Sequence, residues 1–432
     1  MFRALSHRNY KLFFSGQSIS MVGTWMTRIA TSWLVYKLSG SAMLLGVVGF
    51  AGQIPAFLLA PIAGVIVDRM NRHRLLVITQ VLAMVQSVAM AILALSGYIK
   101  LWHIIALSIF QGLINAFDMP ARQAFVVEMV EDPADLPNAI ALNSSLVNGA
   151  RLLGPSIGGV VIAAVGEGWC FAIDGISYLA VIGSLLAMNV NRAMKAAIPD
   201  GGANIFRELR DGWKYVVGSP PISKILILLA AVSLVGMPYT VLMPVFAEKI
   251  LKGGPNTLGL LMASTGIGAL IGAMFLASRK TVLGLGRYIP RMAGLFGITL
   301  VAFSLSRSIW LSVVLLVATG LGFMAQMAVS NTIIQTIVDE DKRGRVMSFY
   351  TMAFMGTIPF GSLLAGTLAE HIGAPETLLI GGIGCTVGAV WFQLSLPRLR
   401  EFVRPIYIRK GILPEVREGV FVTSELSVPP NS

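Results

Sequence analysis

The chain has 432 residues, of which 55% are hydrophobic and only 12% are charged. Soluble domains carry about 25% charged residues, so this composition excludes a water-soluble fold. A helix needs about 20 apolar residues to cross the hydrocarbon core of a bilayer, and a chain of this length has room for about twelve such helices with short loops. The net charge of +12 is then explained first by orientation in a membrane rather than by nucleic acid.

Twelve apolar runs account for most of the chain. The first six cover residues 12–36, 44–67, 75–95, 102–125, 139–165 and 171–188, and the second six cover 222–246, 258–277, 290–305, 310–338, 346–369 and 378–396. They are predicted to be helices, because strands cross lipid only as a closed barrel and the alternating pattern of a barrel is missing. The expected fold is an all-α integral membrane protein with twelve transmembrane helices. Its parts are an N-terminal six-helix half (1–188), a cytoplasmic linker (189–221), a C-terminal six-helix half (222–396) and a cytoplasmic tail (397–432).

Basic residues are distributed unevenly among the loops. If alternate loops lie on opposite sides of the membrane, 26 of the 33 lysines and arginines fall on the side of the N-terminus, 5 on the other side and 2 inside spans. Cytoplasmic loops are enriched in these residues, so both termini are predicted to be cytoplasmic in the plasma or inner membrane of a bacterium. The basic start of the chain resembles a secretory signal, but its apolar run is too long and indicates an uncleaved first span.

The polar break between the two sets contains one helical pattern. Apolar residues recur at helical spacing between residues 205 and 217 while charged residues occupy the other face, which predicts an amphipathic helix on the inner leaflet. Its simplest role is to tether the two halves. The polar residues 423–432 are predicted to be disordered. Cys170 and Cys385 lie in separate runs and predict neither a disulfide nor a metal site.

An internal repeat relates the two sets of spans. Sliding the second half over the first at an offset of 207 residues aligns three glycine pairs, Gly154 with Gly361, Gly159 with Gly366 and Gly166 with Gly373. This offset places the fifth span on the eleventh, as two parallel six-helix halves require. Such halves are one repeat pattern of secondary transporters, which bind substrate between the halves near the midplane of the membrane.

A charged motif stands between the second and third spans. It reads Gly64-Val-Ile-Val-Asp68-Arg69-Met-Asn71-Arg72-His73-Arg74. Gly64 is expected to let a neighbouring helix approach, Asp68 to pair with a basic group or a helix N-terminus, and the arginines to anchor the loop at the inner leaflet. A basic cytoplasmic turn would explain Arg72 and Arg74 but not the spacing from Gly64 to Asp68. The motif resembles the loop signature of the major facilitator superfamily, with asparagine at 71 and histidine at 73 as departures.

The fifth span carries a second motif, Gly149-Ala-Arg151-Leu-Leu-Gly154-Pro155-Ser-Ile-Gly158-Gly159. Pro155 removes a backbone donor and the glycines thin the helix, so the span is predicted to bend and to pack closely against a partner. This resembles half of the superfamily's antiporter signature. Asn148 and Leu152 stand where the family pattern has glycine, which weakens the inference to antiport but not to the fold.

Three further segments extend the resemblance. They are Asp118-Met-Pro120-Ala-Arg122, Asn138-Ala-Ile-Ala-Leu-Asn143 and Lys342-Arg343-Gly344-Arg345. Together with residues 24–28 and 39–46, they look like the subgroup of the superfamily that includes enterobactin exporters and macrolide efflux proteins. The resemblance covers nearly the whole chain up to about residue 397, and it implies an efflux transporter of the major facilitator fold.

Ionisable groups inside spans are costly and are therefore candidates for function. Arg28 and Arg151 lie near the middle of the first and fifth spans, and Asp174 lies about one turn into the sixth. The two arginines either line a cavity for an anionic or carbonyl-rich substrate or form a structural pair with Asp174 or a backbone carbonyl. The later spans carry no deep acid, which favours neutral or anionic cargo over cations. Asp118 is expected to pair locally with Arg122, four residues later.

Proton coupling would need a carboxylate that binds and releases a proton, for which Asp174 is the first candidate and Asp118 the second. Proton-linked members of the superfamily carry an arginine in the fourth span where this chain has Ser108, and this departure counts against inherited antiport. Uncharged polar groups in the spans could bind substrate, although many such groups only join helices. They are Gln53, Gln111, Asn115, Asn143, Asn148, Gln326, Asn331 and Gln335.

The predicted function is secondary active transport, with export of a small neutral or anionic amphiphilic molecule by alternating access. The alternatives are import of a nutrient or movement of a lysophospholipid. A membrane enzyme is disfavoured because the four histidines are scattered and no nucleophile or metal spacing accompanies them, and an ATP-driven pump because no phosphate-binding loop exists. A receptor or scaffold would need a larger soluble module. We expect a monomer that contacts its small-molecule substrate, membrane lipids and protons as the candidate coupling ion, with no cofactor, metal or nucleic acid.

Overall fold

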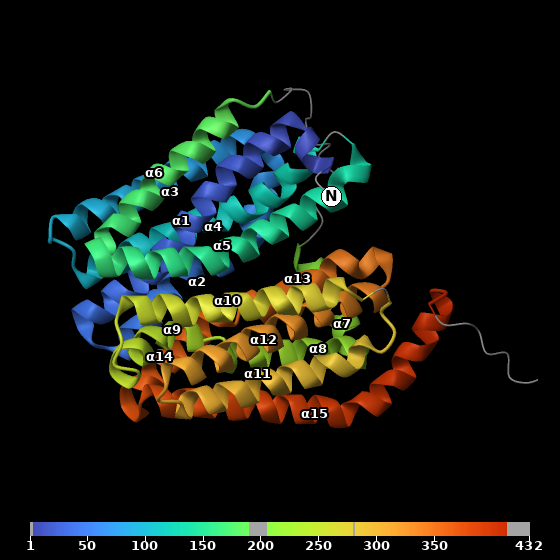
Figure 1. Ribbon diagram of the computed structural model, residues 1–432. Helices are drawn as coiled ribbons and strands as arrows, with labels where there is room; N and C mark the ends of the chain where they lie inside the picture. The colour runs from blue at the N-terminus through green and yellow to red at the C-terminus, as the bar shows by residue number, and fades with distance from the viewer. Residues whose placement is uncertain (1–2, 131, 190–204, 280, 413–432) are drawn as a thin grey trace, which may run out of the picture.

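A computed structural model describes residues 3–130, 132–189, 205–279 and 281–412, and these residues are almost entirely helical (Figure 1). The helices of the first part are η1 (Arg3–Ser6), α1 (Arg8–Ser39), α2 (Ala42–Arg69), α3 (Arg72–Leu95), α4 (Leu101–Met129), η2 (Pro133–Asp135), α5 (Leu136–Val165) and α6 (Glu167–Leu186). Those of the second are α7 (Ile205–Gly218), α8 (Pro220–Ala231), η3 (Val232–Gly236), α9 (Tyr239–Val245), η4 (Phe246–Ile250), α10 (Pro255–Ala277), η5 (Leu285–Arg287), α11 (Tyr288–Leu305), α12 (Ile309–Ile337), η6 (Glu340–Lys342), α13 (Arg343–Met355), α14 (Ile358–Ile372) and α15 (Ala374–Arg409).

Eleven helical segments of the described chain are long and apolar enough to cross a membrane. The first predicted span is not among these eleven, but it forms the 32-residue helix α1, which packs against α5 and α6. Two predicted spans are interrupted helices. The seventh runs from α8 to η4 through two π-helical turns, and the eleventh consists of α13 and α14. The all-α membrane fold expected from the sequence is therefore confirmed.

The helices form two bundles (Figure 1). In the first, α1 packs against α5 and α6, α3 against α6, and α2 against α4. In the second, α12 packs against α10 and α11, and α11 against α15. The main contacts between the bundles are α5 with α10 and α2 with α14. These four helices therefore form the seam between the halves.

Equivalent positions in the two halves share geometry. Gly166, between α5 and α6, has φ 94° and ψ 167°, and Gly373, between α14 and α15, has φ 100° and ψ 152°. A backbone with φ in this range favours glycine, which explains why both positions carry it. Helices α4 and α12 are each 29 residues long and begin 208 residues apart. The glycine repeat in the sequence thus corresponds to a repeat of local structure.

The bundle has two ends, which are named here by their charge. The basic end carries the start of α1, the turn between α2 and α3, helix α7, and the connections around η5 and η6. The opposite end carries the turn after α1 at Gly40 and the turns at Gly166 and Gly373. In Figure 1 the basic end lies to the right, where the N-terminus is marked.

The amphipathic segment of the linker forms helix α7 at the basic end. The Trp213 ring packs against Phe349 of α13, with ring centroids 5.9 Å apart, and the Tyr215 hydroxyl donates to Asp339 Oδ2 at 3.1 Å. Trp213 is nevertheless 58% exposed, as expected for a helix that keeps an apolar face free. The side chains of residues 205–209, the linker residues 190–204 and the polar segment 423–432 lie outside the described residues.

The last helix differs from the prediction. The apolar run ends at residue 396, but α15 continues through Pro397 and Pro405 to Arg409. Its last turn is tied to the end of α12, because Lys410 Nζ donates to the carbonyls of Thr336 at 2.8 Å and Val338 at 2.7 Å. A lysine that donates to the last carbonyls of another helix is favourable at that C-terminus, and this contact holds the polar end of α15, which hydropathy does not predict to be helical.

Candidate functional site

Two arginines of the N-terminal half meet on one aromatic ring. The guanidinium carbon of Arg28 lies 4.8 Å from the centroid of the Trp25 ring, and that of Arg151 lies 5.1 Å from the same ring. Trp25 and Arg28 are one turn apart on α1, and Arg151 comes from α5. Both arginines are predicted from the sequence, but Trp25 is not, although its position three residues before Arg28 is a usable signal.

Within the described part of the chain, neither arginine forms an ion pair with an acid. Among the ion pairs of the described residues, none includes Arg28 or Arg151, and the Nε of Arg151 is buried without a hydrogen-bond partner. Arg28 is exposed although it lies deep within a long helix. The structural alternative of a salt bridge to Asp174 is therefore wrong in this conformation.

Asp174 lies in a different environment, on α6. Its carboxylate is 2% exposed, and Oδ2 accepts hydrogen bonds from Thr27 of α1 and Ser87 of α3, each at 3.0 Å. The other oxygen, Oδ1, is buried without a partner. Gly23 of α1 leaves the space for it, since a Cβ there would lie 2.8 Å from Oδ1. The acid is thus held by hydroxyl groups of two helices and by no cation within the described part of the chain.

Asp118 forms the local pair with Arg122 that the sequence predicts. It also accepts from the Thr79 hydroxyl at 2.8 Å and the Gln80 amide at 2.7 Å, both on α3. Arg122 in turn donates to Gln17 of α1. This network joins three helices near the basic end, and its α1 and α3 members were not predicted, since nothing local in the sequence indicates which helices pack together.

Three of the uncharged polar residues that the sequence offers for substrate binding have either a hydrogen-bond partner on their own helix or no partner. Gln111 donates to Asn115 one turn later at 3.1 Å, and Asn148 donates to the Ser144 carbonyl of its own helix at 2.9 Å. Gln326, on α12, has 0% exposure, and neither its amide nitrogen nor its oxygen has a partner. Their role in binding substrate stays a prediction.

The loop motif between α2 and α3 is held within its own half. Arg72 donates to Glu128 of α4 at 2.7 Å, and the Arg74 backbone N–H is capped by the side chain of Asn71 at 2.9 Å. Glu128 was not predicted. Arg69 is the last residue of α2, and the Asp68 side chain lies outside the described residues.

The expected close approach at Gly64 is absent here. Among the described residues, no atom of another helix lies within 4 Å of where a Cβ would stand at Gly64. The prediction is wrong for this conformation because the halves are separated at the basic end. Gly149 on α5 and Gly344 on α13, also toward that end, face open space in the same way.

The glycine motif of α5 makes the close contacts that its sequence predicts. Gly154 packs against Trp25 and Gly158 against Met26 and Ile29, all on α1. Pro155 is buried within the same stretch. Trp25 therefore connects the glycine motif to the two arginines.

Toward the opposite end, two pairs of glycines bring the halves into contact. A Cβ on Gly159 of α5 would lie 3.0 Å from the Cα of Gly259 on α10, and a Cβ on Gly366 of α14 would lie 2.8 Å from the Cα of Gly46 on α2. Small residues of this kind allow helix backbones to cross closely in membranes. In Figure 1, α5 and α10 lie close together on the left and diverge to the right. The halves are thus closed at the opposite end and apart at the basic end.

A carboxylate adds to this closed contact. Glu370 of α14 accepts hydrogen bonds from the Ser41 hydroxyl at 2.9 Å and the Met43 backbone N–H at 3.1 Å, at the start of α2. An acid at a helix N-terminus is stabilised by the unpaired N–H groups and the helix dipole. Glu370 is not predicted from the sequence, because its partner Ser41 lies 329 residues away in the chain.

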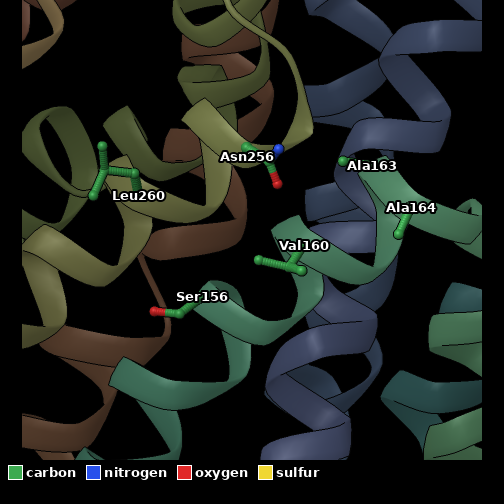
Figure 2. Close-up of a pocket in the computed structure, with 6 residues that line it drawn as sticks. All are labelled: Ser156, Val160, Ala163, Ala164, Asn256 and Leu260. Atoms are coloured by element: carbon green, nitrogen blue, oxygen red, sulfur yellow. The ribbon is translucent and has the colours of Figure 1, made fainter.

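A surface hollow lies on the α5–α10 seam and has a volume of about 520 Å³. Figure 2 shows its lining by side chains of both helices. They are Ser156, Val160, Ala163, Ala164, Asn256 and Leu260. None of these is charged, and none belongs to the predicted site, so this hollow is not the place where the arginines act.

Comparison with known proteins identifies the chain. A family profile described as transmembrane secretion effector matches residues 1–405. The chain belongs to this family of the major facilitator superfamily. The resemblance seen in the sequence is thereby confirmed, and the chain is a membrane transporter.

Several curated relatives align over most of their length. The staphyloferrin A transporter of Staphylococcus aureus is 28% identical and aligns with 86% of this chain and 92% of its own. The multidrug efflux pump Tap of Mycolicibacterium fortuitum is 27% identical, with coverage of 88% and 93%. The macrolide efflux protein A of Streptococcus pyogenes is 23% identical, with coverage of 87% and 94%.

Solved structures share the fold. A POT family transporter superposes with a TM-score of 0.73 at 11% identity, covering 91% of this chain and 96% of that one. A bacterial homologue of the human lysosomal transporter Spinster, in an inward-facing conformation, gives 0.68 at 12% identity, with coverage of 94% and 98%. At these identities the likeness shows the fold alone.

Proposed function

We propose that this transporter is a secondary active exporter of a small neutral or anionic amphiphile from a bacterial cell. The basic end would face the cytoplasm, with both termini on that side, because 26 of the 33 lysines and arginines belong to it. Relatives named for siderophore transport and for multidrug and macrolide efflux support export. The protein would work as a monomer, with substrate bound between its two halves.

The observation that carries the proposal is the arrangement of Arg28, Trp25 and Arg151. Two guanidinium groups lie about 5 Å from one indole ring and have no acid between them. An uncompensated charge within a membrane is costly unless it faces water or a ligand, and the exposure of Arg28 fits a water-filled cavity that opens to the basic end. Such a cavity would accept a carboxylate or carbonyl group at the arginines and a planar group at the indole.

The seam contacts suggest how the cavity would alternate. Gly159 with Gly259 and Gly46 with Gly366 close the opposite end, while Gly64 and Gly149 have no neighbour. If the halves rocked, the first contacts would open and helices would approach Gly64 and Gly149 instead. The loop around Arg69 and Arg72 would then close the basic side, as the loop motif predicts.

Proton coupling is the finer part of the proposal. Asp174 is buried, has one unpaired oxygen, and bonds to hydroxyls of α1 and α3. Movement of α1 against α6 during rocking would change these bonds and so the proton affinity of the carboxylate. Asp118, bound to Arg122, is the second candidate.

The test combines untargeted metabolite profiling with transport in vesicles. Cells with and without the protein are compared for compounds that accumulate in the medium, and each hit is then followed in inverted vesicles under imposed pH gradients. Replacing Arg151 by glutamine should lower the rate for an anionic hit by about 10- to 100-fold, since a hydrogen bond between charged groups is lost. The matched control is Arg343→Gln, a surface arginine whose pair with Glu340 contributes little.

The result that would contradict the proposal is equally specific. Accumulation of the hit inside cells would indicate import, the alternative direction. Wild-type rates in the Arg151→Gln variant for an anionic cargo would remove the arginines from the binding site. A drug-resistance phenotype with an unchanged metabolite profile would indicate a xenobiotic cargo.

A further inference from the structure

The N-terminal half encloses a polar cavity that lies inside one bundle rather than between the two. Its volume is about 80 Å³, and it is bounded by α1, α3, α4 and α6. One water molecule occupies about 30 Å³ in the liquid, so the cavity has space for about two. Its polar lining includes Gln17, Thr24, Gln80, Asn115, Asp118 and Tyr178.

One end of this cavity is the Asp118 carboxylate. Asp118 and Arg122 both line it, and the network through Gln17 and Gln80 holds the acid in place. A buried water needs two to four polar partners, and this wall offers carboxylate, guanidinium and amide groups. The cavity is therefore polar and large enough for ordered water.

The other end leads to Asp174. Tyr178, which lines the cavity, follows Asp174 by one turn on α6, and Thr24 lies beside both the Tyr178 hydroxyl and the Asp174 carboxylate. Asp174 also keeps Oδ1 buried without a partner, facing Gly23. The Tyr178 and Thr24 hydroxyls, the second of which donates to the Ser20 carbonyl at 3.1 Å, thus lie between the cavity and a carboxylate that has room for one more hydrogen bond.

Few charged groups face this line. On α1, Arg28 lies on the Tyr178 side, and α5, which packs on α1 and α6, carries Arg151 over the Trp25 ring. Helix α3 has no charged residue between Leu75 and Leu95. On α6, Glu167 is paired with Lys37 at 2.9 Å, and Cys170 is buried. Helix α2 carries no charge from Ala42 to Val67.

At the basic side, the ion pair of Asp118 is with Arg122, and six residues further along α4 Glu128 is paired with Arg72 of α3. The helices packed on α4 also carry Arg69, His73 and Arg74 toward this end. Asp118 is therefore ion-paired, whereas Asp174 has hydroxyl donors only.

We propose that water in this cavity forms a proton path between Asp118 and Asp174 inside the N-terminal half. The path would run through the Tyr178 and Thr24 hydroxyls, with Arg28 on its Tyr178 side. This inference rests on the proposed proton coupling, and it explains how a proton from the basic end reaches Asp174 through the interior of one bundle. Proton and cargo would then both use the first half, by routes that adjoin at Arg28.

The transfer is a proton exchange with no redox change. An O–H bond at protonated Asp118 breaks as the proton passes to the nearest water, each water and hydroxyl in the line gives one proton and takes one, and an O–H bond forms at Asp174 Oδ1. Asp118 returns to its ionised form beside Arg122, so one negative charge leaves Asp174 and one appears at Asp118. A water molecule or a reoriented hydroxyl must supply the last hydrogen bond, because Oδ1 has no partner among the described residues.

Infrared difference spectroscopy on the full-length protein in lipid nanodiscs tests the path without a known substrate. The band of a protonated buried carboxylic acid is followed as the pH is lowered and as water is replaced by deuterium oxide, and Asp174→Asn assigns it. Two variants interrupt the path: Tyr178→Phe removes a hydroxyl, and Ala83→Leu fills the cavity from a lining position that has no polar group. The matched control is Tyr350→Phe, a buried tyrosine of the other half whose hydroxyl donates to Met327.

In Tyr178→Phe, we expect deuterium exchange of the Asp174 band to slow by on the order of tenfold, because one hydrogen bond is lost from the transfer step. In Tyr350→Phe, exchange should stay at the wild-type rate. Ala83→Leu should slow it at least as much. Because overpacking can disturb folding, each variant is first checked by size-exclusion chromatography.

Two results would overturn the path. One is an Asp174 band that exchanges at the wild-type rate in both interrupting variants, and the other is the absence of any Asp174 band in the wild type at acidic pH. The proposal of proton coupling is contradicted by a different result: the transport rate in inverted vesicles does not depend on the pH gradient, while the Asp174 band still exchanges more slowly in the interrupting variants. The two failures are therefore distinguishable.

Discussion

The two halves of this transporter share a scaffold but differ in chemistry. When α4 and α12 are aligned from their first residues, Gln326 takes the place of Asp118 and Ser330 that of Arg122. At the offset of 207 residues that aligns Gly166 with Gly373, Gly381 takes the place of Asp174. The same offset replaces Arg151 by Ile358. Each ionisable candidate of the first half thus has a neutral counterpart in the second.

The comparison indicates a division of roles. Charge within a membrane is costly, and confining it to one half limits that cost. The second half contributes the surfaces that close the seam, which are Gly259, Gly366 and the Glu370 cap on α2. Substrate and proton chemistry would then belong to the first half, and the second would act mainly as the moving partner.

The largest difference between the halves in the effect of a substitution on stability is expected at the equivalent positions Asp118 and Gln326. Asp118→Ala would leave the half-buried Arg122 without its ion pair and the Thr79 and Gln80 donors without their acceptor, and should lower the free energy of unfolding by about 2–4 kcal/mol. Gln326→Leu should be neutral or stabilising, because it removes a buried amide that has no partner. Thermal unfolding of both variants in the same detergent measures the contrast. Equal destabilisation by the two changes would contradict the conclusion that the halves differ in chemistry at this position.

A smaller and symmetric effect is expected at the seam glycines. Gly159→Ala and Gly366→Ala each place a Cβ within 3.0 Å of backbone on the other half, so each should disfavour the closed contact by about 1–3 kcal/mol. The population with an open opposite end should rise by about 5- to 150-fold. Spin-label distances between α6 and α14 at that end would report it.

The matched control for the seam glycines is Gly149→Ala, since nothing lies within 4 Å of that position. A shift as large in this control as in Gly159→Ala would mean that the α5 glycines act through helix propensity rather than through the contact. A shift at only one of the two crossings would show that the seam is not symmetric.

The smallest effect is expected at Glu370. Glu370→Gln removes the negative charge from the N-terminus of α2 and should weaken closure by about 0.3–1 kcal/mol, or about two- to fivefold in population. The effect should shrink at high salt because the group is exposed. The same spin-label pair measures it. Glu376→Gln, which changes the charge at the same end in the first turn of α15, serves as control, and an equal shift there would contradict a specific cap.

Much of the fold could be predicted from the sequence because its signals are local. Apolar runs of about 20 residues indicate spanning helices whatever their neighbours are. The glycine and proline pattern from Gly154 to Gly159 indicates close packing because only small residues permit it. Charged residues are rare in the spans, and this rarity indicates Arg28, Arg151 and Asp174 as candidates, because a charge within the membrane is costly unless it has a function or a partner.

Other features depend on which helix faces meet, and no local pattern encodes that. Hydropathy places Arg28 and Arg151 in spans, but only the packing of α1 against α5 brings both onto Trp25. The spacing of Asp118 and Arg122 predicts their pair, but not the α3 donors. The polar continuation of α15 is helical because its last turn caps α12, a contact between distant segments.

The sequence by itself determined the class of the protein, its spans, its repeat and the few charges that matter, because length, hydropathy and charge act along the chain. Tertiary structure alone decided the conformation, closed at Gly159 and Gly366 and open at Gly64. It also decided the separation of the arginines from the buried acids. The physical reason is that two packings of the same helices satisfy the same hydropathy pattern, and only contacts across the seam distinguish them.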